Sequence, residues 1–275
     1  MTRSIALALA LAGCTPQVVT RAPAAGYVPN SPQLTDVTRV IVLGDGVSAG
    51  VGASSPDLAY ASLLMHNDDL LWPGWTGREL GALYPNLDEV IVVSQPGATI
   101  GQVYADQLTH LEDRLGPEVD GQTLIIATLG TTELAAALRG EPAGDVESEV
   151  DAITAFFTDT RRFPDGAALF VANLHDPTDG VGWASGCTRL GASSHLPWLS
   201  DTNAHRRITA QQHGFAVVDA RSRFEGHGLY AGDPRLDTWN PLTGAPWLAG
   251  CVYPDARGHH ELRRLFWRAI VHGEG

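Results

Sequence analysis

Short apolar runs alternate with longer amphipathic segments along most of the chain. Five apolar runs predict buried strands, at 38–43, 89–94, 123–129, 168–174 and 215–219. Between them, apolar residues recur at helical spacing in 100–115, 147–162, 201–213 and 257–271. Alternation of this kind predicts an α/β fold, with a parallel sheet covered by helices on both faces.

Two long stretches, 175–200 and 221–250, break the alternation and are rich in Gly, Pro, Asp and aromatic residues. We expect them to be loops at the carboxyl ends of the strands, where open sheets of this kind carry their sites. They hold four of the seven tryptophans: Trp183, Trp198, Trp239 and Trp247. These rings either offer a surface on which a ligand stacks or supply the loops with a small core of their own.

The N-terminus has the pattern of an export signal. Met1, Thr2 and Arg3 precede an apolar run at 5–12 that is too short to span a bilayer. It ends in Leu-Ala-Gly before Cys14, which resembles the lipobox of bacterial lipoproteins. The resemblance implies a signal peptide at 1–13 and a lipid on Cys14. The alternative is an ordinary cleaved signal followed by a chance cysteine.

Residues 14–33 are rich in Pro, Ala, Ser and Thr without periodicity, which predicts a solvated tether. Residues 34–275 then form one domain, and 44% hydrophobic composition is enough for one sizeable core. A net charge of −13 argues against nucleic acid and anionic membrane surfaces as partners of this domain. We expect a monomer attached to the membrane through the lipid alone.

Two further cysteines, Cys187 and Cys251, belong to a chain expected in a compartment where disulfides persist. We expect them to be paired. The alternative is a pair of buried free thiols, because the sequence does not give the distance between them.

Four short blocks follow predicted strands or precede the last helix. They lie at 42–53, 94–99, 128–134 and 250–259, and they begin with the Gly-Asp-Gly-Val-Ser that follows the first strand. In order and position they resemble the four blocks of the SGNH/GDSL hydrolases, a family of esterases and lipases. The resemblance spans essentially the whole domain. It implies a flavodoxin-like three-layer α/β/α sandwich around a five-stranded parallel sheet.

The positions that would carry the family's chemistry hold other residues. Gly46 stands where the nucleophilic serine belongs, Tyr253 where the histidine base belongs, and Gly250 where the orienting aspartate belongs. Of the oxyanion donors, Gly97 remains, while the asparagine is replaced by Thr132. Glycine offers no nucleophile, and tyrosine, with a pKa near 10, is a poor base at neutral pH. Ester hydrolysis by the family's route is therefore excluded.

Relocated chemistry is the main alternative. Ser48 and His259 lie near the lost nucleophile and base in the sequence and could form a new pair. Against this, Ser48 matches a structural hydroxyl position of the family, and His259 matches a histidine that packs or caps on the last helix. Asp45 is expected to hold the turn after the first strand, and Asp255 to cap the last helix.

Two loop histidines, His175 and His227, have Asp176 and Asp233 nearby in sequence. No spacing typical of a metal site supports a cluster, so we expect solvated histidines, with no metal and no cofactor.

The sequence therefore favours an exported lipoprotein that is a pseudoenzyme and binds an acylated or glycan ligand of the cell envelope. One alternative is an active ester hydrolase that uses Ser48 and His259. Another is a structural envelope protein with a protein partner. Threonine at position 15, directly after the lipidated cysteine, suggests an outer-membrane location facing the periplasm.

Overall fold

The computed structural model describes residues 34–144, 146–242 and 244–273. The predicted signal peptide at 1–13, the lipidation site Cys14 and the tether at 14–33 lie outside these residues. None of the helices in the described part is long and apolar enough to cross a bilayer.

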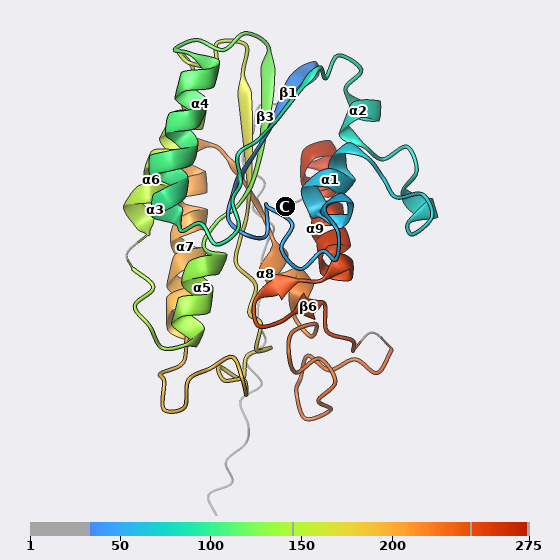
Figure 1. Cartoon of the computed structure of the whole chain (residues 1–275), viewed down its shortest axis with the longest axis vertical. Helices are drawn as coiled ribbons and strands as arrows, with labels where there is room; N and C mark the ends of the chain where they lie inside the picture. The colour runs from blue at the N-terminus through green and yellow to red at the C-terminus, as the bar shows by residue number, and fades with distance from the viewer. Residues whose placement is uncertain (1–33, 145, 243, 274–275) are drawn as a thin grey trace, which may run out of the picture.

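The predicted five-stranded parallel sheet is confirmed, with strand order β2-β1-β3-β4-β5 (Figure 1). Its strands are β1 (Val37–Gly44), β2 (Glu89–Val92), β3 (Gln122–Thr128), β4 (Ala167–Ala172) and β5 (Ala216–Val218). The order places β1 between β2 and β3. The carboxyl ends of these three strands, and the first three blocks that follow them, therefore meet at one edge of the sheet.

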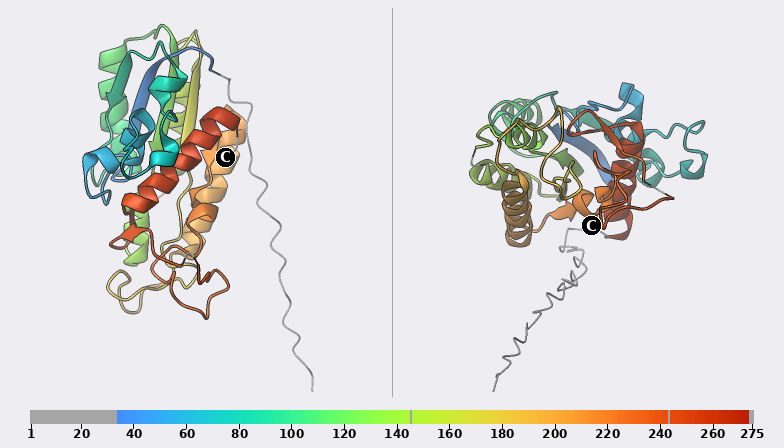
Figure 2. Two further views of the ribbon diagram at one scale, coloured as in Figure 1. Left: turned by 90° about the vertical axis from the view of Figure 1, so that its right-hand side faces the viewer. Right: turned by 90° about the horizontal axis from the view of Figure 1, so that it is seen from below.

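Helices cover both faces, which completes the three layers (Figures 1 and 2). One face carries α1 (Tyr60–Met65) and α9 (Ala256–His272), and α8 (Ala220–Phe224) packs beside α9. The other carries α3 (Ile100–Gln102), η3 (Val103–Gln107), α4 (Leu108–Leu115), α6 (Glu147–Thr158) and α7 (Leu196–His213). Side chains of β1 alternate between the two cores: Val40 and Val42 face α1 and α9, and Ile41 and Leu43 face the opposite layer.

The predicted helix at 100–115 is interrupted by a turn of π-helix, η3. This turn carries Gln107, whose buried side-chain amide accepts from the N–H of Gly44 at 2.8 Å and donates to the carbonyl of Gly44 at 2.9 Å. The bulge thus aims one polar side chain at the turn that follows β1, which is a recurrent use of π-bulges.

Several helix bounds differ from those predicted. Helix α6 ends at Thr158 instead of 162, and α7 begins at Leu196, inside the stretch predicted as a loop. The sequence pattern also missed short elements. These are η1 (Pro56–Leu58), α1, η2 (Pro73–Trp75), α2 (Leu80–Leu83), α5 (Thr131–Leu138), α8, β6 (Leu248–Ala249) and β7 (Tyr253–Pro254). None of them exceeds eight residues, which is shorter than the window of roughly 11 to 18 residues over which periodicity is recognised.

The two long loops gather at the lower end of the molecule, beyond the carboxyl ends of the strands (Figures 1 and 2). Trp247 is buried there, with its ring stacked on His227 at a centroid distance of 3.3 Å and edge-on to Phe224 at 5.6 Å. Trp183 and Trp239 remain exposed. The loops thus have a small core around one tryptophan, while two other rings stay at the surface.

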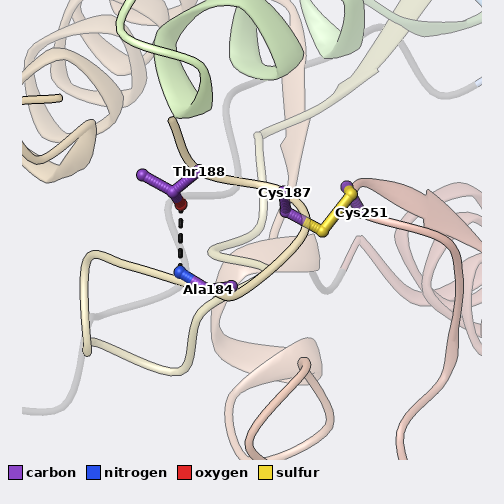
Figure 3. Close-up of a disulfide and its surroundings, with 4 residues drawn as sticks. All are labelled: Ala184, Cys187, Thr188 and Cys251. Carbon is purple, nitrogen blue, oxygen red and sulfur yellow. Dashed lines mark hydrogen bonds between the residues drawn. A yellow bond between two sulfur atoms is a disulfide. The ribbon is translucent and has the colours of Figure 1, made fainter. Parts of the chain in front are cut away.

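The predicted disulfide between Cys187 and Cys251 is confirmed (Figure 3). Its Cα atoms are 5.5 Å apart, and it joins the first long loop to the turn between β6 and β7. It therefore ties the loop to the chain segment that carries the last sequence block.

Replacing both cysteines by alanine is expected to lower the free energy of unfolding by roughly 4 kcal/mol, since the bridge closes a loop of 64 residues in the unfolded chain. Urea denaturation of the double variant and of the wild type measures this difference. Wild type unfolded under reducing conditions is the matched control and should behave like the variant. Equal midpoints for variant and oxidised wild type would contradict the prediction.

Candidate functional site

The turn after β1 is anchored by Asp45, which is fully buried. Its carboxylate accepts from the N–H of Val47 at 3.0 Å, the hydroxyl of Thr128 at 2.9 Å and the N–H of Thr131 at 2.7 Å. Burial raises the pKa of Asp45, and these hydrogen bonds oppose that rise. Asp45 thus joins the turn after β1 to the end of β3 and the start of α5, as expected for a structural aspartate.

The turn also requires a glycine at position 44, because the backbone of β3 lies very close to it. Gly44 has φ of +123°, and a Cβ placed on it would lie 2.0 Å from the carbonyl oxygen of Thr128. Only glycine fits at this position, which lets the turn sit directly against β3.

Gly46, the position at which the sequence resemblance places the nucleophile, is covered by the ring of Tyr253. A Cβ placed on Gly46 would lie 2.7 Å from Cε1 and 3.3 Å from the hydroxyl oxygen of Tyr253. The tyrosine thus occupies the space that a side chain at position 46 would need. Burial raises the pKa of Tyr253, and the nearby Asp45 carboxylate raises it further, so the phenol stays protonated at neutral pH.

Gly250 lies in the turn between β6 and β7, at φ of +80°. A Cβ placed there would contact nothing within 4 Å. A Cβ would therefore meet no neighbour, but the backbone has the left-handed conformation that disfavours most side chains.

Three hydrogen-bond donors follow β1, β2 and β3 without a protein partner. Within the described residues, neither the N–H of Gly46 nor that of Gly97 donates a hydrogen bond, and the buried hydroxyl of Thr132 has no partner. The loop after β2 is fixed to α5, since the N–H of Ile100 donates to the carboxylate of Glu133 at 2.8 Å. Because β1 lies between β2 and β3, these donors all follow strand ends at the same side of the sheet, and unpartnered donors of this kind can bind a carbonyl oxygen.

Ser48 lies deep in a buried hydroxyl network. Its Oγ is 2.9 Å from the hydroxyl of Tyr60 and 2.8 Å from that of Thr128, and it accepts from the N–H of Thr128 at 2.9 Å. Its hydrogen-bonding capacity is thus used within the core.

His259 is fully buried, and both of its ring nitrogens are engaged. Nδ1 accepts from the N–H of Tyr60 at 3.2 Å, so Nε2 carries the proton and donates to the carbonyl of Val51 at 3.1 Å. Burial lowers the pKa of His259 to about 4. No hydrogen bond joins Ser48 to His259 in the described structure, although both contact Tyr60.

The loop histidines are not solvated, and that prediction was wrong. His175 is buried, with its ring 4.9 Å from that of Phe224, and burial lowers its pKa to about 4. His227 is buried against Trp247. Their aromatic partners lie 49 and 20 residues away in the chain, so no local pattern could indicate the contacts. No cluster of three or more metal-binding side chains occurs in the described part of the chain.

Two residues that shape the site were missed by the sequence reasoning. Tyr60 contacts both Ser48 and His259 from the short helix α1. Arg206 is fully buried on α7 and donates to the carbonyls of Ala172 at 2.8 Å and Leu129 at 3.0 Å, which joins the ends of β3 and β4. Arginine side chains usually lie at the surface, so no pattern in the sequence indicates this role.

Comparison with known proteins agrees with this architecture. A lipase of Streptomyces rimosus is 25% identical over 248 residues, which cover 81% of this chain and 80% of the lipase. An α/β hydrolase enzyme from the metagenome of Lake Arreo has the same fold, with a TM-score of 0.55, 13% identity and coverage of 88% of this chain and 99% of that one. The chain therefore has the α/β fold of a known hydrolase and is similar in sequence to a lipase.

An acetyl xylan esterase of Geobacillus stearothermophilus shares the fold as well, with a TM-score of 0.52, 16% identity and coverage of 87% and 97%. No family model matches the chain. These two solved structures support the fold alone, because both are below 25% identity.

Proposed function

We propose that this protein is a pseudoenzyme: it keeps the cleft of an ester hydrolase, has lost ester hydrolysis, and binds an acylated or glycan ligand. The contact between Tyr253 and Gly46 carries the proposal. Tyr253 stands at the position of the base, and its ring fills the space that a side chain at position 46, the position of the nucleophile, would need. The two residues therefore fit each other as a pair. A protonated phenol at that place supplies neither a nucleophile nor a base at neutral pH.

Ligand binding is supported by the donors that remain. The N–H groups of Gly46 and Gly97 and the hydroxyl of Thr132 can hold a carbonyl oxygen without any nucleophile beside it. Hydrolysis needs the nucleophile and the base, whereas binding of a carbonyl oxygen needs only these donors. A protein that has lost hydrolysis can therefore still bind its ligand.

The active-hydrolase alternative requires Ser48 and His259 to act as nucleophile and base. Both are buried, and both ring nitrogens of His259 already hold backbone partners. A base needs a free nitrogen within reach of the nucleophile, so the pseudoenzyme has the better support. The structural envelope protein, the other alternative, would bind no ligand in the cleft.

A fluorophosphonate probe, which reacts with activated serines, is expected to leave the protein unlabelled. Intact-mass spectrometry after incubation measures the adduct, and hydrolysis of p-nitrophenyl butyrate measures turnover. An active serine esterase of the same fold is the positive control. An adduct mapped to Ser48, together with turnover that disappears in Ser48→Ala, would replace the pseudoenzyme by the relocated hydrolase.

We further propose that the protein is exported and attached to the envelope by lipid on Cys14, in the outer membrane facing the periplasm, as a monomer. The Leu-Ala-Gly-Cys ending of the signal supports the anchor. The disulfide supports export, because such bonds persist in oxidising compartments.

Exchanging Cys14→Ser is expected to abolish metabolic labelling with a fatty acid and to move the protein from the membrane pellet to the soluble fraction. Ser31→Ala, a change in the predicted tether, is the control and should label like the wild type. Undiminished labelling of Cys14→Ser would exclude the anchor.

A further inference from the structure

A groove of about 1160 Å³ lies in the second long loop, at the lower end of the molecule and below α8 (Figure 1). Among the described residues that line it, none is Gly46, Gly97 or Thr132, the residues whose donors belong to the candidate cleft. Its volume exceeds the roughly 300–1,000 Å³ of pockets that hold one small molecule, so a ligand of several linked rings fits.

Backbone contacts hold the walls of the groove together. The N–H of Trp247 donates to the carbonyl of His227 at 2.9 Å, and the N–H of Asp255 donates to the carbonyl of Trp247 at 2.8 Å. A Cβ placed on Gly226, which has φ of +82°, would lie 2.5 Å from the carbonyl oxygen of Thr238. All five residues line the groove, so its shape is formed before any ligand binds.

Two arginines are fixed at the wall of the groove by a buried carboxylate. The side chain of Glu261 is 0% exposed, and it lies 3.0 Å from Nη2 of Arg257 and accepts from Nε of Arg223 at 3.0 Å. Arg264 contacts the same carboxylate at 3.0 Å. Arg223 and Arg257 also lie over the ring of Trp247, 5.1 and 5.8 Å from its centroid. A guanidinium has five N–H groups and a carboxylate accepts about four hydrogen bonds, so three arginines keep donors for a ligand.

The charges of the lining balance each other. The ionised side chains among the described lining residues are Arg223, Arg257, Glu225 and Asp255, and burial lowers the pKa of His227, which is therefore neutral at neutral pH. An anion would meet two carboxylates and a cation two guanidiniums. A hydroxyl group both donates and accepts, so a neutral ligand with many hydroxyls can use both kinds of group.

Trp239 offers this groove a flat apolar surface. Its side chain is 40% exposed and lines the groove. Trp247, the other tryptophan of the lining, is buried against His227 and the arginines. A sugar ring carries C–H groups on its faces and hydroxyls at its edge, so one face packs on an indole while the edge bonds to polar groups.

We propose that this groove is a second ligand site, which binds a neutral saccharide of several linked rings. One ring stacks on Trp239, and hydroxyls at its edge bond to Arg257 and Asp255. The proposal goes beyond the function proposed for the cleft and does not depend on it, because none of the three donors of the cleft lines the groove.

The test uses the full chain in a detergent that carries no sugar, with an immobilised panel of neutral oligosaccharides: cellohexaose, xylohexaose, mannohexaose and chitohexaose. Binding to at least one of them is expected, and calorimetric titration with that oligosaccharide gives the dissociation constant. Trp239→Ala should weaken binding by roughly tenfold or more. Trp183→Ala is the matched control and should bind like the wild type, since Trp183 is 43% exposed in the other long loop. Urea denaturation checks that the variants fold.

Asp255→Asn distinguishes a neutral ligand from an anion. Asparagine caps a helix about as well as aspartate, so α9 keeps its first turn, while the groove loses a charged acceptor. A neutral saccharide should then bind several-fold more weakly. An anion would bind more tightly, because a repelling charge is removed.

Four results would overturn the proposal. They are a lack of binding to the whole panel, equal affinities of Trp239→Ala and wild type, equal losses in Trp183→Ala and Trp239→Ala, and tighter binding after Asp255→Asn. Fluorophosphonate labelling tests the cleft by itself, so either proposal can fail without the other.

Discussion

The exchange Gly46→Ser alone is expected to yield no esterase activity and to lower the free energy of unfolding. Its Cβ would lie 2.7 Å from the ring of Tyr253, closer than side chains normally approach, so either the ring or the turn must shift. The new hydroxyl would also have no base beside it, and an unassisted serine is a weak nucleophile. Chemical denaturation and p-nitrophenyl butyrate hydrolysis measure the two effects.

Combining this exchange with Tyr253→His removes the clash and supplies the base in one step. Adding Gly250→Asp restores the orienting carboxylate, although the left-handed backbone at φ of +80° costs about 1 kcal/mol. Adding Thr132→Asn restores the family's side-chain amide. Residues that act as one unit are strongly non-additive, so the quadruple variant is expected to exceed every single variant by on the order of a hundredfold or more.

The control for this series is the quadruple variant with alanine in place of serine at position 46, which keeps the other three changes. Its turnover should equal that of the wild type. Comparable rates for the serine and alanine forms would show that the cleft no longer has the shape of an ester hydrolase.

The fold could be predicted because its main signals are local. Runs such as 123–129 are continuous and apolar, since a strand with helices on both sides is buried on both faces, and β3 is buried along nearly its whole length. The interruption of the helix at 100–115 could not be predicted in this way. It depends on Gln107 reaching Gly44, a contact 63 residues away in the chain.

The residues of the candidate site could likewise be predicted only where the signal is local. Ordered sequence blocks located Gly46, Gly97, Thr132 and Tyr253, because each follows the end of a strand or precedes the last helix. The blocks could not show that the ring of Tyr253 fills the space that a side chain at position 46 would need. Such complementarity depends on three-dimensional packing, which brings together two positions that lie more than 200 residues apart in the sequence.

Acid is expected to destabilise the protein strongly, and His259 is expected to carry a measurable share of that effect. Burial lowers the pKa of His259 to about 4, and its Nδ1 must remain unprotonated to accept from the N–H of Tyr60. In the unfolded chain the histidine takes up a proton near pH 6.5, so the unfolded state binds more protons. Its contribution to stability is complete above pH 6.5 and is lost as the pH falls towards 4.

In the variant His259→Gln, the fall in the free energy of unfolding between pH 6.5 and pH 4 should be smaller than in wild type by about 3 kcal/mol. Urea denaturation at a series of pH values measures it, and His110→Gln, a change of an exposed histidine, should keep the wild-type slope. If the free energy of unfolding fell equally with pH in His259→Gln and in wild type, the buried, neutral state of His259 would be contradicted. A pKa near 7 for His259, measured by NMR titration, would likewise contradict the buried, neutral state. It would also support the alternative in which His259 is a catalytic base. A catalytic base must exchange protons at the working pH, which a buried structural histidine does not do.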